Sequence, residues 1–220
     1  MDLKALIPGE LGRARQRDED SAPLPGRLHT DGRVERSRRA RVAIAEALLD
    51  LLDQGVIAPT ANQIAEQAKV STRLLFHHFA DIDAIYATAA DQQLKRLAPL
   101  VKRVDPALPF QLRVREFVRV RVRLFERFTP VRRASVRLEP FSAEIARKLS
   151  YAHQLSRDMA CQAFEHELNA LPQGRARDVA CALDAVSSWE NWEFLRRRAG
   201  LSLRGARRVL EQMVTMVFAR

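Results

Sequence analysis

The sequence predicts an all-α protein with a small N-terminal helical unit and a larger helical remainder. Apolar residues recur at the spacing of amphipathic helices over most of the 220 residues, and typical N-cap residues precede several of these repeats. No alternating strand pattern or Asn-Gly hairpin turn is present. These patterns favour a fold without sheets.

The composition is that of a globular protein with a sizeable core. Hydrophobic residues make up 47% and charged residues 29%, and no stretch reaches the roughly 18 unbroken apolar residues of a membrane span. The first residues lack the apolar segment of a secretory signal, so we expect a cytoplasmic location and no membrane partner.

Cys161 and Cys181 lack the close spacing of a zinc site. Buried thiols are the plain interpretation, and a redox switch is the alternative.

The net charge of +10 is compatible with a nucleic-acid partner but does not establish one. Residues 1–96 are almost balanced, whereas residues 97–220 carry 23 basic and 13 acidic groups. Arg outnumbers Lys 32 to 5, which a GC-rich genome would also produce. The type of partner must therefore come from local patterns.

The first elements are an extension and one long helix. Residues 1–32 mix Pro and Gly with scattered charges and show no apolar period, so we expect a disordered N-terminal extension. A helix is predicted over Ser37–Gln54, ended by Gly55. Its apolar stripe has the spacing i, i+4, i+7, i+8 and consists of Ile44, Leu48, Leu51 and Leu52.

Two short helices and a longer one follow. Thr60 and Gln63 form a capping box that opens the first short helix. Ser71 is placed to cap a second short helix over Thr72–Phe79. Asp81 caps the longer helix that leaves this unit. Two short helices joined by a tight turn are typical of a helix-turn-helix, which assigns residues 33–80 to one domain.

Residues 81–220 are predicted to form a second helical domain. Pro99 and Pro106 interrupt its beginning. The apolar periods then predict further helices over Pro109–Phe128, Val131–Leu138, Ser142–Leu171, Arg175–Arg198 and Leu203–Ala219.

The segment 60–71, TANQIAEQAKVS, followed by LFHHF at 75–79, closely resembles the signature of the TetR (tetracycline-repressor) family of transcriptional regulators. The segment from Trp192 to Leu203 is similar to the join between the family's last two helices. The resemblance implies an N-terminal three-helix helix-turn-helix DNA-binding domain and a C-terminal helical effector-binding and dimerisation domain. It further implies a homodimer, acting as a repressor on a near-palindromic double-stranded DNA operator.

Three positions depart from the family pattern. Lys69 stands where the family has Gly in the turn, Phe76 where it has Tyr, and Ile82 where it has Lys. Lys69 strains the turn if a positive φ is required. The other two changes remove groups that touch DNA phosphates in the family, so a weaker or differently anchored complex is expected.

The candidate DNA-binding residues lie in two groups. In the recognition helix, Thr72 and Arg73 are expected to reach base edges, with His77 as a further candidate. His78 matches a position that meets the DNA backbone, and Phe76 could pack on a thymine methyl or sugar. Thr60 and Ser71 complete this group. The second group is a basic segment in which Glu35 is the only acidic residue: Arg33, Arg36, Arg38, Arg39 and Arg41. This segment is expected to grip the DNA backbone or to enter the minor groove. The alternative is a run of charges that is merely solvated.

No metal or cofactor is expected. His77 and His78 are adjacent, so on a helix their side chains diverge by about 100°, and no third ligand is near in sequence.

On the helix after Pro109, Arg121 interrupts the apolar stripe and is predicted to face inward. An inward guanidinium needs a partner. One alternative is a structural carboxylate, namely Asp158, Asp184 or Glu190. The other is an anionic effector in a pocket with Phe117, Phe125, Tyr151 and Trp189 as walls. A separate stripe, expected in water or over an acidic neighbour, consists of Arg115, Arg119, Arg123 and Arg127.

In the family the last two helices form a four-helix dimer interface, which implies a set of contact residues here. These are Ala182, Ala185, Val186, Trp189, Val209, Leu210, Met213 and Val217.

An enzyme is not expected, because the sequence contains no P-loop, dinucleotide-binding turn, nucleophile elbow or His-Glu-x-x-His motif. The alternative to a DNA-binding regulator is a helical interaction or membrane-surface protein that uses the Arg-rich segment 113–137.

Overall fold

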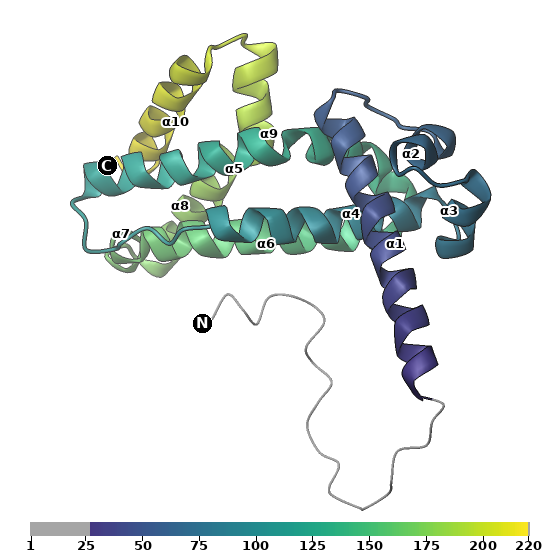
Figure 1. Ribbon diagram of the computed structural model, residues 1–220. Coiled ribbons are helices and arrows are strands. Elements are labelled where there is room, and N and C mark those ends of the chain that lie inside the picture. Colours follow the sequence, from purple (N-terminus) through teal and green to yellow (C-terminus); the bar gives the residue numbers. More distant parts are fainter. Residues whose placement is uncertain (1–26, 220) are drawn as a thin grey trace, which may run out of the picture.

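The computed structural model describes residues 27–219, and all regular structure in this range is helical (Figure 1). Two short segments are 3₁₀-helical, η2 (Ala98–Leu100) and η3 (Glu139–Phe141), and one is π-helical, η4 (Phe194–Arg198). The α-helices are α1 (Arg27–Asp53), α2 (Ala61–Gln67), α3 (Thr72–His78), α4 (Ile82–Leu97), α5 (Phe110–Leu138), α6 (Ala143–Ala163), α7 (Glu165–Asn169), α8 (Gln173–Val186), α9 (Trp189–Glu193) and α10 (Leu203–Val217).

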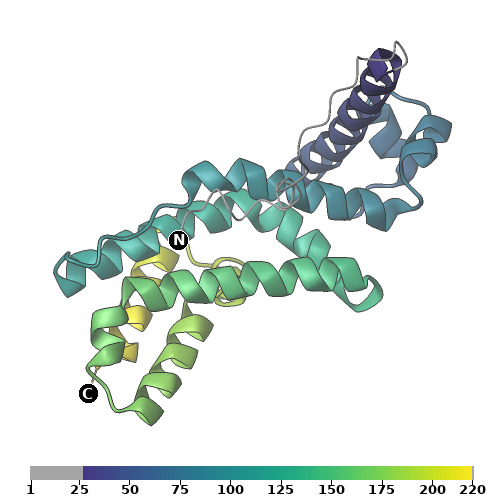
Figure 2. The same ribbon diagram turned by 90° about the horizontal axis from the view of Figure 1, so that it is seen from below.

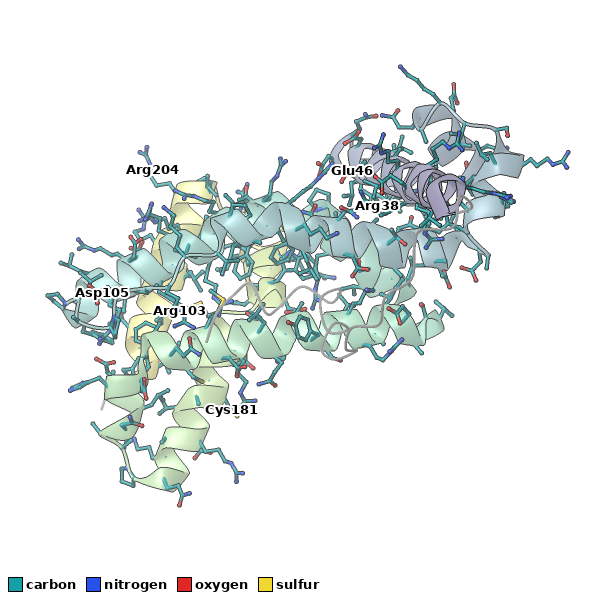
Figure 3. The ribbon with its side chains drawn as sticks, turned by 60° about the horizontal axis from the view of Figure 1, so that its bottom comes forward. Arg38, Glu46, Arg103, Asp105, Cys181 and Arg204 are labelled. Carbon is teal, nitrogen blue, oxygen red and sulfur yellow. The ribbon has the colours of Figure 1, made fainter. Side chains whose placement is uncertain are left out.

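The molecule is elongated, with α1, α2 and α3 at one end and α7, α8 and α10 toward the other (Figure 2). Arg38 and Glu46 on α1 lie far from Arg204 on α10 and Cys181 on α8 (Figure 3). Helices α4, α5 and α6 run between the two ends. None of the helices that the structure describes is both long enough and apolar enough to cross a membrane.

Helix α1 begins ten residues before the predicted Ser37, so the last part of the expected disordered extension is helical. Residues 1–26 lie outside the described residues. The helix ends as predicted: Gly55 has φ +91°, its N–H donates to the Leu52 carbonyl at 3.0 Å, and the Val56 N–H donates to the Leu51 carbonyl at 3.0 Å. This is the hydrogen-bond pattern of a Schellman motif, which requires a left-handed residue and therefore favours glycine.

The predicted break before Val131 is wrong, because α5 continues through Pro130 as a single helix of 29 residues. Proline removes one backbone hydrogen bond but does not prevent the helix from continuing where packing on both sides holds it. Phe125 and Val131 are both buried, and the Thr129 hydroxyl donates to the Phe125 carbonyl at 2.6 Å.

Two other predicted helices are each divided. Phe164 separates α6 from α7 with φ −120°, ψ 27°, because its fully buried ring packs edge-on against Phe117 at 5.2 Å between ring centroids. Ser187 and Ser188 separate α8 from α9, and the Ser188 hydroxyl caps α9 by accepting from the Asn191 N–H at 3.2 Å. After α9 the chain continues as the π-helical segment η4, which a 3.6-residue period cannot predict.

Two large apolar clusters hold the structure together. The first joins α1, α2, α3 and α4 to the end of α5 and the start of α6, so it crosses the expected domain boundary at residue 80. Val131, Ala134, Ile145 and Leu149 are its members beyond α4. The second cluster joins α5 to α6, α8, α9 and α10. A small third cluster, Leu97, Val120 and Leu124, lies between α4 and α5.

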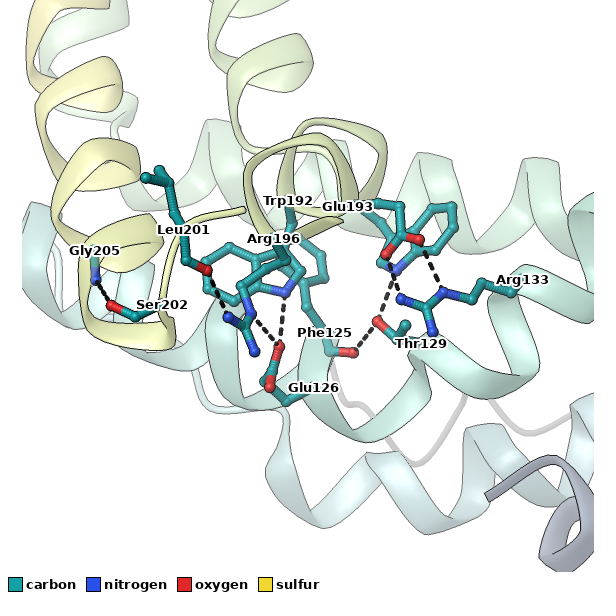
Figure 4. A network of polar contacts seen from close by, with 11 residues as sticks. Phe125, Glu126, Thr129, Arg133, Trp192, Glu193, Arg196, Leu201, Ser202 and Gly205 are labelled. Atoms are coloured by element: carbon teal, nitrogen blue, oxygen red, sulfur yellow. Dashed lines mark hydrogen bonds and ion pairs between the residues drawn. The ribbon is translucent and has the colours of Figure 1, made fainter. Parts of the chain in front are cut away.

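Polar contacts fix α9 and η4 on α5 (Figure 4). The indole N–H of Trp192 donates to the Glu126 carboxylate at 3.0 Å, and that of Trp189 donates to the Thr129 hydroxyl at 2.9 Å. Arg133 forms two hydrogen bonds with the Glu193 carboxylate at 2.8 and 3.0 Å. Both tryptophan rings are buried, so their N–H groups would be left unsatisfied without these partners.

Pro130→Ala restores a backbone N–H inside α5 and removes the proline ring, which crowds the preceding turn of the helix. We expect the free energy of unfolding to rise by about 1–3 kcal/mol, measured by urea denaturation. Pro140→Ala is the control, because Pro140 occupies the first turn of η3, where no N–H is required, and its substitution should change stability little. Equal effects of the two substitutions would contradict the explanation.

Candidate nucleic-acid interface

Helices α2 and α3 are set by side-chain caps at the predicted residues. The Thr60 hydroxyl accepts from the Gln63 N–H at 3.3 Å, and the Gln63 side chain accepts from the Thr60 N–H at 2.9 Å, which completes the capping box. The Ser71 hydroxyl accepts from the Leu74 N–H at 3.1 Å. Thr60 and Ser71 therefore position the two helices through their hydroxyls.

The turn between these helices contains a strained residue. Lys69 has φ +57° and is the one non-glycine residue in the described part of the chain with a positive φ. The conformation allows the Val70 N–H to donate to the Ala65 carbonyl at 2.9 Å, which closes the end of α2. A side chain with a Cβ disfavours this conformation. The sequence-based expectation of a strained turn at Lys69 is thus confirmed.

The two faces of α3 differ in character. Leu75 is fully buried against α1 and α2, and Phe79 follows it into the same core. Arg73, Phe76 and His77 are exposed, with 48% of Phe76 accessible. Their spacing of i, i+3 and i+4 places them on one face of the helix, opposite the core. This face is free to meet another molecule.

A hydrogen bond links this helix to α2. The Thr72 hydroxyl donates to the Asn62 side-chain oxygen at 3.1 Å. Asn62 is exposed at the start of α2, beside the outward face of α3. Sequence reasoning missed Asn62, because only the folded turn brings position 62 to position 72.

His78 is turned toward α1 rather than fully outward. Its Nδ1 lies 3.4 Å from the Ser37 hydroxyl. Burial is the largest effect that lowers the pKa of the His78 imidazole, and the charges of His77 and Arg41 lower this pKa further. A neutral imidazole can donate one hydrogen bond to a phosphate but supplies no charge.

The basic segment proposed from the sequence is helical and its arginines have different environments. Arg33 is exposed, and the Arg36 Nε donates to the Gly32 carbonyl at 3.1 Å. Arg41 is half-buried: its guanidinium donates to the His78 carbonyl at the end of α3 and lies 4.2 Å from the centroid of the Phe79 ring. Arg41 therefore joins α1 to α3.

Arg38 and Arg39 are exposed but share one carboxylate. Glu35 accepts from Arg38 at 2.8 and 2.9 Å and from Arg39 at 3.0 Å. These two hydrogen-bonded arginines lower the pKa of Glu35 to about 2. A helix about 10–12 Å wide does not fit the roughly 6 Å minor groove, so entry into this groove would involve the arginine side chains of α1 and not the helix itself.

Arg121 is buried as predicted, but the structure gives it protein partners. Its guanidinium donates to the Ser156 hydroxyl and, at 2.5 Å, to the Ser156 carbonyl, and lies 4.9 Å from the Phe117 ring centroid. Burial lowers the pKa of Arg121 to about 10, while the charge of Asp184 acts in the opposite direction. Of the three carboxylates suggested from the sequence, Asp184 alone influences Arg121 in this way, and it is an electrostatic neighbour rather than a hydrogen-bond partner.

The other residues expected to wall an effector pocket differ in their burial. Phe117 and Phe125 are buried in the second apolar cluster, and Trp189 is held by Thr129. Tyr151 is 41% exposed on α6.

The residues expected at a dimer interface have mixed positions. Leu210 is fully buried in the core of its own chain, and Trp189 belongs to the same core. Four others are half-buried along the edge of that core: Val186, Val209, Met213 and Val217. Ala182 and Ala185 are exposed on α8.

Among the residues that the structure describes, no group of three or more His, Cys, Asp or Glu side chains is placed to hold a metal ion.

The geometry defines a class of protein: an all-helical chain with a capped helix-turn-helix at one end, whose second helix presents an exposed polar and aromatic face. No protein-family model matches the sequence, and no curated protein matches it. Solved structures do match. A transcriptional regulator from Rhodococcus sp. Rha1 aligns with a TM-score of 0.62 and 17% identity, over 80% of this chain and 95% of its own.

A second match is a protein from Rhodococcus sp. described as a TetR-family transcriptional regulator, with a TM-score of 0.57 and 16% identity over 82% of this chain and 100% of its own. The chain therefore has the fold of the TetR-family transcriptional regulators, as the resemblance at residues 60–79 implied.

Lys69→Gly removes the strain in the turn. We expect the free energy of unfolding to rise by about 1 kcal/mol, because glycine tolerates a positive φ that a side chain disfavours. Lys69→Ala removes the same charge but keeps a Cβ, so its stability in a urea titration should stay close to that of the unchanged protein. The explanation fails if the Ala and Gly variants are equally stable.

Proposed function

We propose that this protein is a cytoplasmic DNA-binding transcriptional regulator that binds a near-palindromic operator as a homodimer. The observation that carries the proposal is the helix-turn-helix with its outward face of Arg73, Phe76 and His77. A helix of this kind enters the major groove, and a guanidinium can make a bidentate contact with guanine there. The fold shared with transcriptional regulators supports the same function.

The proposed contacts divide into base edges and backbone. Arg73, Thr72 and His77 reach bases, while Phe76 packs on a thymine methyl or a sugar. Thr60, Ser71 and the exposed arginines of α1 contact phosphates. His78 donates a hydrogen bond to a phosphate, and Arg41 contributes by holding α1 against α3.

We further propose that residues 33–80 act as the DNA-binding domain and residues 81–220 as the effector-binding and dimerisation domain. Dimerisation would use the exposed Ala182 and Ala185 on α8 together with the half-buried edge of α10. Such a dimer places two recognition helices about 34–36 Å apart, or a multiple of this distance, on DNA. Repression of transcription and release by a small-molecule effector complete the proposal.

Selection of bound sequences from a random double-stranded DNA library tests the function. An inverted repeat is expected, and Arg73→Ala should weaken binding to it by about 1–3 kcal/mol and relax the preference at one base pair of each half-site. Arg198→Ala removes a similar exposed arginine from η4, far from α3, and should leave binding unchanged. Enrichment of no sequence by the unchanged protein would overturn the proposal.

Glu35→Gln tests the role of α1. Loss of the carboxylate frees Arg38 and Arg39, so affinity for the selected operator at low salt should rise and the salt dependence should steepen by about 1 to 2 in log–log slope. Glu116→Gln, which frees Arg119 on α5 in the same manner, is the matched control for the added charge and should leave DNA binding unaltered. If both variants bind more tightly by the same factor, the effect comes from net charge and α1 has no specific role.

A further inference from the structure

A groove of about 600 Å³ lies where the middle of α5 packs against the start of α10. Its volume falls within the range of small-molecule sites, about 300–1,000 Å³. Helix α5 lines one wall with residues at the spacing i, i+3, i+4, i+7 and i+8, so a single stripe of this helix faces the groove. The start of α10 and Leu100 of η2 complete the lining. The groove is open to solvent and separate from the buried Arg121.

The walls carry a strong excess of positive charge. Five arginines and one glutamate line the groove: Arg119, Arg123, Arg127, Arg204 and Arg207, with Glu126. Glu126 is already engaged, because it accepts from the Trp192 indole at 3.0 Å and lies 3.5 Å from the Arg196 Nε. Part of its charge is therefore matched by Arg196, which does not line the groove.

The arginines differ in their availability. Arg119 pairs with Glu116, and Arg207 pairs with Glu211 at 2.9 Å. Within residues 32–219, neither Arg123 nor Arg204 forms a hydrogen bond or an ion pair with its side chain, and both are exposed. Figure 3 shows Arg204 extending outward from α10. These two guanidiniums, one on each wall, can close on an anion between them.

The groove also has an apolar component. Val122 is buried at its floor, while Leu203 is 46% exposed at its rim and Leu100 is half-buried on the remaining side. The aliphatic stems of the arginines add to this surface. An anion without an apolar part would leave Leu203 in water.

From this combination we propose that the α5–α10 groove binds a small amphiphilic anion, with a phosphate or carboxylate held by Arg123 and Arg204 and an aliphatic portion lying on Val122, Leu203 and Leu100. Both the charge imbalance and the exposed leucine are accounted for by such a ligand. A purely aliphatic ligand leaves the arginines unused, and a plain inorganic anion leaves the apolar floor unused.

The position of Arg127 gives the groove a link to the DNA-binding end. The charge of Arg127 lowers the pKa of Asp53, at the end of α1, against the larger opposite effect of burial. Helix α5, which lines the groove, also packs on α1, so an anion bound by the groove arginines would act on a helix that supports the DNA-binding end. Only this regulatory consequence rests on the proposed function, since ligand binding itself requires no DNA.

Titration calorimetry with octyl phosphate, on the full chain without DNA, tests the site. The unchanged protein should bind it, and the double variant Arg123→Gln, Arg204→Gln should bind at least tenfold more weakly. The matched control is Arg175→Gln, Arg177→Gln, which removes two exposed charges from α8 and should bind as the unchanged protein does. Circular dichroism verifies that both variants keep their helices, and operator binding by both should remain intact.

Octanol and inorganic phosphate separate the two parts of the ligand, and both should bind much more weakly than octyl phosphate. Equal binding of inorganic phosphate, or an equal loss in the control variant, would show a general charge effect and overturn the proposal. Equal binding of octanol and octyl phosphate would also overturn the proposal. Flotation with phosphatidylglycerol vesicles separates a free ligand from a membrane: capture by vesicles without binding of octyl phosphate overturns the small-molecule site. A protein that binds its operator but not octyl phosphate loses this inference alone.

Discussion

The structure depends on the burial of α5 over most of its circumference. This helix supplies residues to all three apolar clusters: Val131 and Ala134 to the first, Phe117 and Phe125 among others to the second, and Val120 with Leu124 to the third. A helix that is apolar on several sides must be enclosed by its neighbours. Helices α4, α6 and α10 therefore arrange themselves around α5, and the first cluster carries the helix-turn-helix with them.

Burial of α5 has an electrostatic consequence, because arginines interrupt its apolar sequence. Arg113 and Arg121 are each 4% exposed. Arg113 pairs with Glu167 and donates to the Pro106 carbonyl at 2.5 Å, whereas Arg121 relies on Ser156. A buried charge is tolerated only where such partners exist. The arginines that could not be enclosed collect on the remaining stripe, which lines the groove with α10.

The orientation of α3 depends on α1 as much as on its own caps. Ser71 starts α3, but Arg41 closes its other end by donating to the His78 carbonyl and stacking on Phe79. A cation at the C-terminal end of a helix also interacts favourably with the helix dipole. One arginine of the basic segment is therefore structural, and the others are exposed on α1.

The sequence by itself determined the all-helical class, the caps at Thr60, Ser71 and Asp81, the strained Lys69 and the inward direction of Arg121, because each depends on spacing or on neighbours within a few residues. Only the tertiary structure decided the continuity of α5 through Pro130, the breaks at Phe164 and Ser187, the partner of Arg121 and the inward turn of Arg41. Each of these results from contacts between residues far apart in sequence, where packing outweighs local propensity. The groove between α5 and α10 is likewise decided by the tertiary structure. Its α5 arginines form a regular stripe in the sequence, but the wall that faces them comes from residues about 80 positions later. No local period can reveal such a pairing.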